Sequence, residues 1–336
     1  MKALDINQIL GHIEDTVRSH EIETGAYSRW TLGSRSTGIN PYGCADAANI
    51  LYTLNRFPKE AEIRTKWIAV LQSLQDPITG LFSEGTHLPV HTTAHCLGAL
   101  ELFDAGPLYP VSAWEAYRDT DKLHDLLNGL DWEHEKGCGH IGAAVYAIFA
   151  LCDMSAEHPL PDDWRESYFD WFDSNCDPET GVWRKGHLTD GASITQRMGS
   201  AFHFYFNYSH ARRSFPYPEA LIDCCLDRCH TPNGYTGYPR FGEQFHYIEM
   251  DWVYCLNRAS RQTPHRFHEI RQALYEFAAE YVNYLNQVEW ESDPGADDLH
   301  MLFGTLCCLA ELQQALPGVI HSSEPLRLVL DRRPFI

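Results

Sequence analysis

Six stretches of small and apolar residues recur along this chain, and each begins with a polar or charged group. They are YGCADAANILYTL, HTTAHCLGALELF, GHIGAAVYAIFAL, SITQRMGSAFHFYF, YIEMDWVYCLNRA and DDLHMLFGTLCCLAEL. The markers Asp46, His95, His140, Gln196, Glu249 and Asp298 follow one another at intervals of 49, 45, 56, 53 and 49 residues. Each interval has room for a second helix and two loops. The sequence therefore predicts six helical hairpins in a ring, an all-α (α/α)6 barrel of about twelve helices and a single domain over residues 1–336.

The segments between these stretches have the pattern of amphipathic surface helices. In residues 59–75, for example, Ile63, Trp67 and Leu71 lie on one helical face. The six recurring stretches have no such charged face, which is typical of helices buried on nearly all sides. We expect them to form the inner ring, with their polar first residues meeting at one mouth. The outer helices are expected near residues 5–21, 59–75, 112–130, 162–175, 217–229 and 265–287.

Composition narrows the class of protein and of ligand. Hydrophobic residues make up 44% of the chain and charged residues 21%, as in globular proteins. The sequence contains no run of eighteen apolar residues, so we expect no membrane span. The N-terminal segment carries acids where a signal peptide needs an apolar core. The odd count of 11 cysteines argues against a secreted disulfide framework, so we expect a cytoplasmic protein. The formal net charge of −20 disfavours nucleic acid and anionic membranes as partners, and a small molecule or oligosaccharide is expected instead.

A short turn phrase occurs twice, as Asp76-Pro-Ile-Thr-Gly-Leu-Phe82 and Asp177-Pro-Glu-Thr-Gly-Val-Trp183. Asp-Pro starts a turn, Gly supplies a positive φ, and the aromatic residue returns to the core or stacks on a ligand at the mouth. The phrase resembles turns of six-hairpin glycosidases, such as unsaturated glucuronyl and rhamnogalacturonyl hydrolases. It is similar, less closely, to repeat turns of terpenoid cyclases and protein prenyltransferases. The resemblance implies an α/α toroid and, from the first group, an enzyme acting on carbohydrate.

Four acids at the starts of inner helices are the candidate catalytic residues: Asp46, Glu249, Asp251 and Asp298. Acids at such positions also cap helices, so capping is the competing interpretation. A glycosidase uses one carboxyl group as general acid and a second as base or nucleophile, and an inverting pair stands on the order of 6.5–9.5 Å apart. Acids facing each other across the ring would have this separation. We therefore predict acid–base catalysis by paired carboxylates, without a cofactor.

Polar and aromatic residues near these acids are the candidate substrate-binding groups. Asn49 shares a helical face with Asp46. Arg197 is suited to a substrate carboxylate or to a surface ion pair. Aromatic rings would stack on a sugar. The full set is Trp30, Tyr42, Asn49, His91, His95, His140, Trp183, Gln196, Arg197, Trp252 and Tyr254.

Two of these histidines, His91 and His95, have a spacing that admits a metal ion. They lie four residues apart on one helical face, and His140 or Asp46 would be the third ligand. A histidine acting as general base and a structural pair at a helix start are the other interpretations. The Glu of an H-E-x-x-H motif is missing, and we predict no metal.

The leading prediction is a hydrolase of a small glycoside or oligosaccharide. One alternative is a terpenoid-cyclase-like enzyme with an acidic proton donor in an aromatic pocket, which the run Phe202-His-Phe-Tyr-Phe206 supports. The cyclases' D-x-D-D motif is absent, since Asp297-Asp298-Leu-His300 matches it only in part. The other alternative is a non-enzymatic scaffold, in which every acid at the mouth is paired or capped and no deep pocket exists. The sequence does not indicate the oligomeric state.

Overall fold

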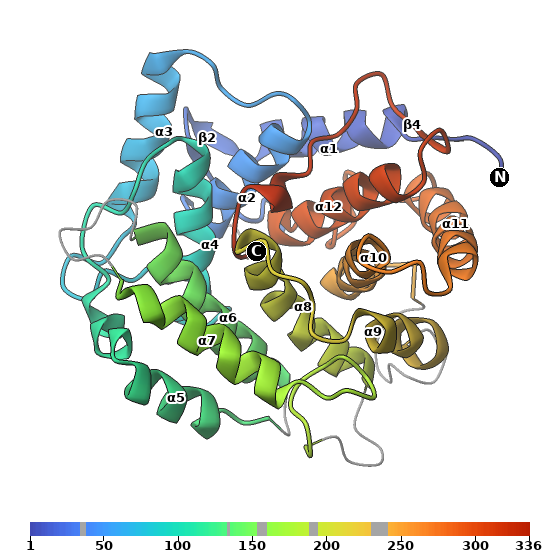
Figure 1. Ribbon diagram of the computed structural model, residues 1–336. Coiled ribbons are helices and arrows are strands. Elements are labelled where there is room, and N and C mark those ends of the chain that lie inside the picture. Colours follow the sequence, from blue (N-terminus) through green and yellow to red (C-terminus); the bar gives the residue numbers. More distant parts are fainter. Residues whose placement is uncertain (34–37, 133–134, 153–159, 188–193, 230–240) are drawn as a thin grey trace.

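Six helices form the inner ring of this all-α structure, a computed structural model that describes residues 1–33, 38–132, 135–152, 160–187, 194–229 and 241–336. Each inner helix packs against the next one along the ring, and the last packs against the first (Figure 1). The predicted (α/α)6 barrel is therefore confirmed. The inner helices are α2 (Pro41–Thr53), α4 (Pro89–Leu102), α6 (Glu135–Cys152), α8 (Ile194–His210), α10 (Tyr247–Ser260) and α12 (Leu299–Ala315).

The outer helices alternate with the inner ones along the chain. Two expected segments differ in detail. Residues 112–130 divide into a 3-10 helix, η2 (Ser112–Arg118), and an α-helix, α5 (Thr120–Gly129). The division falls at Asp119, which caps α5 by accepting a hydrogen bond from the backbone N–H of Lys122. The segment 217–229 ends in a π-helical turn, η4 (Cys225–Cys229). The outer helices are α1 (Asn7–Ser19), α3 (Ala61–Ser73), α5 (Thr120–Gly129), α7 (Asp162–Asn175), α9 (Pro218–Cys224) and α11 (Phe267–Leu285).

Short strands contribute little to this fold. In the described part of the chain, β1 (Leu4–Asp5) pairs in parallel with β4 (Ile320–His321), and β2 (Glu21–Glu23) pairs antiparallel with β3 (Ala26–Tyr27). No helix within the described residues has the length and apolar character needed to span a membrane.

Small residues allow the inner helices to approach their neighbours. A Cβ atom on Gly43 would lie 2.6 Å from the backbone of Ser28, and one on Gly139 would lie 2.8 Å from the carbonyl oxygen of Ser200 on the next inner helix. No real side chain tolerates such distances, so these positions require glycine. The inner stretches are rich in small residues because the ring leaves no room for larger ones.

The repeated Asp-Pro phrase forms turns whose aromatic residue enters the core. The Asp76 carboxylate accepts hydrogen bonds from the backbone N–H groups of Ile78 (3.0 Å) and Thr79 (2.7 Å). Gly80 and Gly181 have φ of 73° and 69°, as the predicted turns require. Both aromatic residues that follow, Phe82 and Trp183, are buried in the core.

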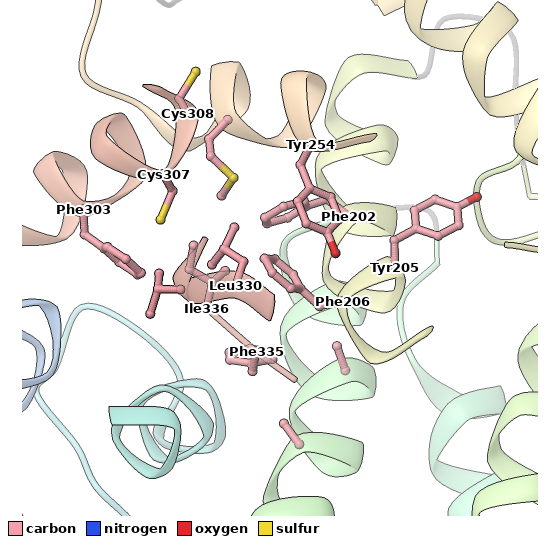
Figure 2. Close-up of a cluster of buried hydrophobic side chains, with 14 of the residues drawn as sticks. Phe202, Tyr205, Phe206, Tyr254, Phe303, Cys307, Cys308, Leu330, Phe335 and Ile336 are labelled. Carbon is pink, nitrogen blue, oxygen red and sulfur yellow. The ribbon is translucent and has the colours of Figure 1, made fainter. Parts of the chain in front are cut away.

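The C-terminal segment fills the middle of the ring. After the short helix η5 (Val329–Asp331), the chain runs into the space enclosed by the inner helices, and its end lies near the ring centre in Figure 1. Figure 2 shows Phe335 and Ile336 between Phe303 of α12 and Phe206 of α8. The buried guanidinium of Arg333 donates hydrogen bonds to the Asn49 side chain (2.5 Å) and to His95. The tail thereby joins α2, α4, α8 and α12.

The fit of Arg333 against α4 generates a test of this arrangement. A Cβ atom on Gly98 would lie 2.7 Å from the Arg333 guanidinium, whose hydrogen bonds leave it no room to move. Gly98→Ala is expected to lower the free energy of unfolding by about 1–3 kcal/mol. Gly11→Ala on α1 is the matched control, because a Cβ there meets nothing within 4 Å, and it should gain up to about 1 kcal/mol. Urea unfolding of both variants measures the difference. Equal stability of Gly98→Ala and the parent protein would contradict the packing described for Arg333.

Candidate functional site

A pocket of about 320 Å³ lies at the N-terminal ends of the inner helices. Its walls come from α4, α6, α8, α10 and α12, and Ile336 of the C-terminal segment also contributes. The residues predicted to meet at the mouth are partly together there, since His91, His140, Gln196 and Asp251 all line the pocket. The remaining lining residues are Thr86, His87, Gly199, Ser200, His203, His246, Tyr247, Ile248, His300 and Met301.

Asp46 lies at the base of this site and joins two histidines. Its carboxylate accepts hydrogen bonds from Nε2 of His95 (2.7 Å) and from Nδ1 of His300 (3.2 Å), and all three side chains are buried. Burial alone would raise the pKa of Asp46, but the two histidines outweigh burial and hold it below its usual range. Asp46 is therefore an ionised group that orients imidazoles, and it does not itself line the pocket.

The hydrogen bonds around Asp46 determine which ring nitrogens carry protons. Arg333 only donates, so Nδ1 of His95 accepts its N–H (3.1 Å), and Nε2 of His95 donates to Asp46. The Tyr247 hydroxyl donates to the backbone carbonyl of His300 (2.8 Å) and lies 3.0 Å from Nδ1 of the same residue. Nδ1 of His300 therefore carries the proton, and its Nε2 is left to accept one. Burial, opposed by Asp46, lowers the pKa of His300 well below its ordinary value.

Asp251 is the acid that faces the pocket. It is only 5% exposed, and in the described part of the chain its Oδ1 has no hydrogen-bond partner. Its Oδ2 lies beside Gly199 of α8, where a Cβ atom would come within 3.0 Å. Burial first, and the nearby Glu249 second, raise the pKa of Asp251 well above its ordinary value. The surroundings of Asp251 thus favour its protonated form inside a polar pocket.

The other two predicted acids have structural partners outside the pocket lining. Glu249 accepts hydrogen bonds from the side chain of Gln244 (2.6 Å) and the backbone of Gly242 (3.1 Å), and burial raises its pKa to about 7. Asp298 caps α12 by accepting from the backbone N–H of His300 (3.0 Å) and forms a two-point ion pair with Arg29 (2.7 and 2.9 Å). The capping interpretation describes Asp298.

The predicted aromatic and amide groups lie mainly in the core. Trp183 and Trp252 are buried and donate their indole N–H to backbone carbonyls, and Tyr254 donates to Ser209 (2.9 Å). Trp30 packs under the guanidinium of Arg29. The ring of Tyr42 stacks on His95, and its hydroxyl group bonds to Nδ1 of His91. Asn49 bonds to the backbone of Ala45 and to Arg333, while Arg197 bonds to the backbone of Trp132. Of this set, Tyr42 is in contact with the pocket histidines His87, His91 and His300.

Several site residues were missed by the sequence analysis, namely His87, His203, Tyr247, His300 and Arg333. A usable signal existed for His203, which follows Gln196 by seven residues and so occupies the same helical face. His300 follows Asp298 by two residues in the last marker stretch. Arg333 has no periodic context, because it lies in an irregular tail that only the tertiary structure brings to the ring.

The protonated state of Asp251 has a consequence for stability. The unfolded chain ionises this group above pH 3.8, whereas the folded protein retains the proton, so folding stability declines as pH rises between the two pKa values. Asparagine is neutral in both states. Asp251→Asn is therefore expected to raise the Tm at pH 7 by about 2 °C or more. The gain should vanish near pH 4, as measured by calorimetry in the presence of EDTA.

The exposed Asp125 of α5 supplies the control for this experiment. Asp125→Asn should leave the Tm unchanged at both pH values. A lower Tm for Asp251→Asn at pH 7 would show that the carboxyl group is ionised and paired in the folded protein.

Comparison with known proteins identifies no relative of this chain. No protein-family model, no curated protein sequence and no solved structure matches it. The toroid is established by the helix arrangement alone, and a fold of this kind does not assign an activity. The function has to be argued from the chemistry of the pocket.

Proposed function

We propose that this protein is a carbohydrate-active enzyme that hydrolyses a small glycoside or oligosaccharide in the histidine-lined pocket. One observation carries the proposal: a buried carboxylic acid, Asp251, and an imidazole oriented by a carboxylate, His300, line the same cavity. Environments that push the pKa values of two groups in opposite directions are typical of an acid–base pair. Here burial raises the pKa of Asp251 and lowers that of His300.

Asp251 is suited to the role of general acid. A general acid must hold a proton at neutral pH and release it to the departing oxygen. The Oδ1 of Asp251 makes no hydrogen bond in the described structure, so its bonding capacity is left for this contact. Its proton would pass to the glycosidic oxygen as the bond to the anomeric carbon breaks.

His300 is suited to the role of general base. Its Nδ1–H is held by Asp46, so Nε2 accepts a proton from an attacking water molecule. The Asp46 carboxylate stabilises the imidazolium that results, as a carboxylate does in other histidine-based sites. The oxygen of this water bonds to the anomeric carbon, and the sugar leaves with a new hydroxyl group. A carboxyl–imidazole pair thus takes the place of the paired carboxylates expected from the sequence.

The lining of the pocket supports a small hydroxylated substrate. Thr86, Gln196 and Ser200 offer hydrogen-bonding groups in addition to the histidines, while Ile248 and Met301 add apolar surface. A volume of about 320 Å³ lies at the lower end of the range for ligand pockets, so a short substrate is favoured over a long polymer.

The cyclase-like alternative shares one observation, since a protonated Asp251 would also suit an alkene. However, the aromatic residues of this run on α8, namely Phe202, Phe204, Tyr205 and Phe206, are buried in the core and are not among the pocket-lining residues. Figure 2 shows Phe202 and Phe206 packed with Tyr254 near the C-terminal Phe335 and Ile336. The scaffold alternative requires every acid at the mouth to be paired, which the unpartnered Oδ1 of Asp251 in the described structure speaks against.

The role of Asp251 is tested by the leaving-group dependence of the reaction. With aryl glycosides, Asp251→Asn is expected to lower kcat by about 10²–10⁴-fold when the leaving phenol is poor. The loss should shrink to less than tenfold for a dinitrophenolate, which departs without protonation. His300→Gln should lower kcat by the same factor for the poor phenol and for the dinitrophenolate. The exposed His268→Gln should change kcat for neither substrate. Equal losses for Asp251→Asn across all leaving groups would exclude general-acid catalysis by this residue.

A pH–rate profile provides a second test. The reaction needs neutral His300 and protonated Asp251, so kcat/KM should fall on the acid side below pH 6.5 and again on the alkaline side. His300→Gln should lack the acid limb, and Asp251→Asn the alkaline limb, in their residual activities. A profile with both limbs intact in both variants would assign the titrating groups elsewhere.

A further inference from the structure

Three imidazoles from successive inner helices converge on one point of the pocket. His91 of α4, His140 of α6 and His203 of α8 each offer a ring nitrogen, and these nitrogens all lie within 4.8 Å of one another. The ring centroids are 4.3 Å apart for His91 and His140, and 5.1 Å apart for His140 and His203. This set was not anticipated as a whole, because the i, i+4 pair in the sequence was His91 with His95.

Hydrogen bonds made by one ring nitrogen orient two of these rings. Nδ1 of His91 bonds to the Tyr42 hydroxyl, and Nδ1 of His203 donates to the backbone carbonyl of Gly199 (3.0 Å). Nε2 is the nitrogen left on each ring for a ligand. Metal-binding histidines usually have such a partner on the second nitrogen, since it fixes the tautomer and the ring direction.

A nearby carboxyl group provides an independent indication of a cation. Asp251 lines the same pocket, is more than nine-tenths buried, and has an oxygen without a hydrogen-bond partner in the described structure. Burying a carboxyl group in this state costs free energy unless something compensates for it. Water bound to a cation at the three imidazoles would give this oxygen the hydrogen-bond partner that it lacks.

We propose that His91, His140 and His203 bind one divalent transition-metal ion of the zinc class, with a coordination position open to the pocket. Imidazole nitrogens bind Zn²⁺ at about 2.0–2.1 Å, so tetrahedral ligands stand about 3.3 Å apart and small ring movements would close this set. Three protein ligands and one exchangeable position are the pattern of catalytic zinc sites. The open position would accept water or a substrate oxygen. Metal binding is measurable without substrate and does not depend on the proposed hydrolysis.

The described structure contains a second group of possible metal ligands, namely Asp46, His95 and His300. Their ligand atoms already take part in hydrogen bonds. Both histidines donate to Asp46, and Nδ1 of His95 accepts from Arg333. A cation there would have to displace these bonds next to a buried guanidinium, which repels it. A metal ion is therefore expected at His91, His140 and His203 and not at the second group.

The test uses the full chain without an affinity tag, stripped of metal by EDTA and titrated with Zn²⁺ and Co²⁺. Calorimetry should show one equivalent of Zn²⁺ per chain, and Co²⁺ should produce the strong visible absorption of a tetrahedral site. His140→Gln and His203→Gln should each weaken binding at least 100-fold. Tyr42→Phe, which keeps the ring but removes the hydroxyl from His91, should weaken it about 10–100-fold.

One control makes the outcome unambiguous. The exposed His268→Gln should bind as the parent protein does. His300→Gln tests the second group of possible ligands, which the inference does not use. Circular dichroism checks that each variant is folded. No binding by the parent protein, or binding lost in His300→Gln and retained in His140→Gln, overturns the inference. Metal binding without hydrolysis of any glycoside would reject the proposed function alone, and hydrolysis unaffected by EDTA in a protein that binds no metal would reject the metal site alone.

Discussion

The buried carboxylate of Asp46 is the interaction on which the rest of this structure depends. A carboxylate in a protein interior is very costly unless it is paired and hydrogen-bonded. Asp46 meets this requirement through His95 and His300, and Arg333 extends the chain of bonds behind His95. The four residues come from α2, α4, α12 and the C-terminal tail. The inner ring and the C-terminal segment therefore have to assemble together. Each of them supplies a hydrogen-bond partner for a polar side chain that is buried by the other.

The same chain of bonds prepares the pocket for chemistry. Arg333 can only donate, so each hydrogen bond after it has a defined direction, and the chain ends at His300 with Nε2 ready to accept a proton. On the neighbouring inner helix α10, burial and Glu249 raise the pKa of Asp251, so keeping its proton at neutral pH costs stability. Such costs are commonly found at functional sites, where a group is held in the state that the reaction needs. Asp46 and its two histidines are thus hydrogen-bonded to one another, whereas Asp251 has an oxygen without a partner in the described structure.

Local patterns were enough to predict the helices and the mouth. The period of about fifty residues, the amphipathic outer segments and the small-residue inner stretches predicted the alternation of inner and outer helices, because burial on one side or on all sides leaves a direct mark on residue choice. Polar residues at the starts of the inner helices predicted the mouth, and His91, His140, Gln196 and Asp251 do line the pocket. Trp183 and Trp252, which were predicted to stack on a sugar, are instead buried core residues.

The sequence by itself determined the number, order and type of the helices and the end of the ring at which polar groups gather. Only the tertiary structure decided which of those groups face the cavity and in which state they are held. Only the assembled ring fixes the rotation of each inner helix. The hydrogen bonds of Asp46 with His300 and of Arg333 with His95 join residues more than 200 positions apart. Periodicity records the surroundings of a residue along its own helix. The partners that set its protonation and orientation lie on other helices, and they are defined only when the ring assembles.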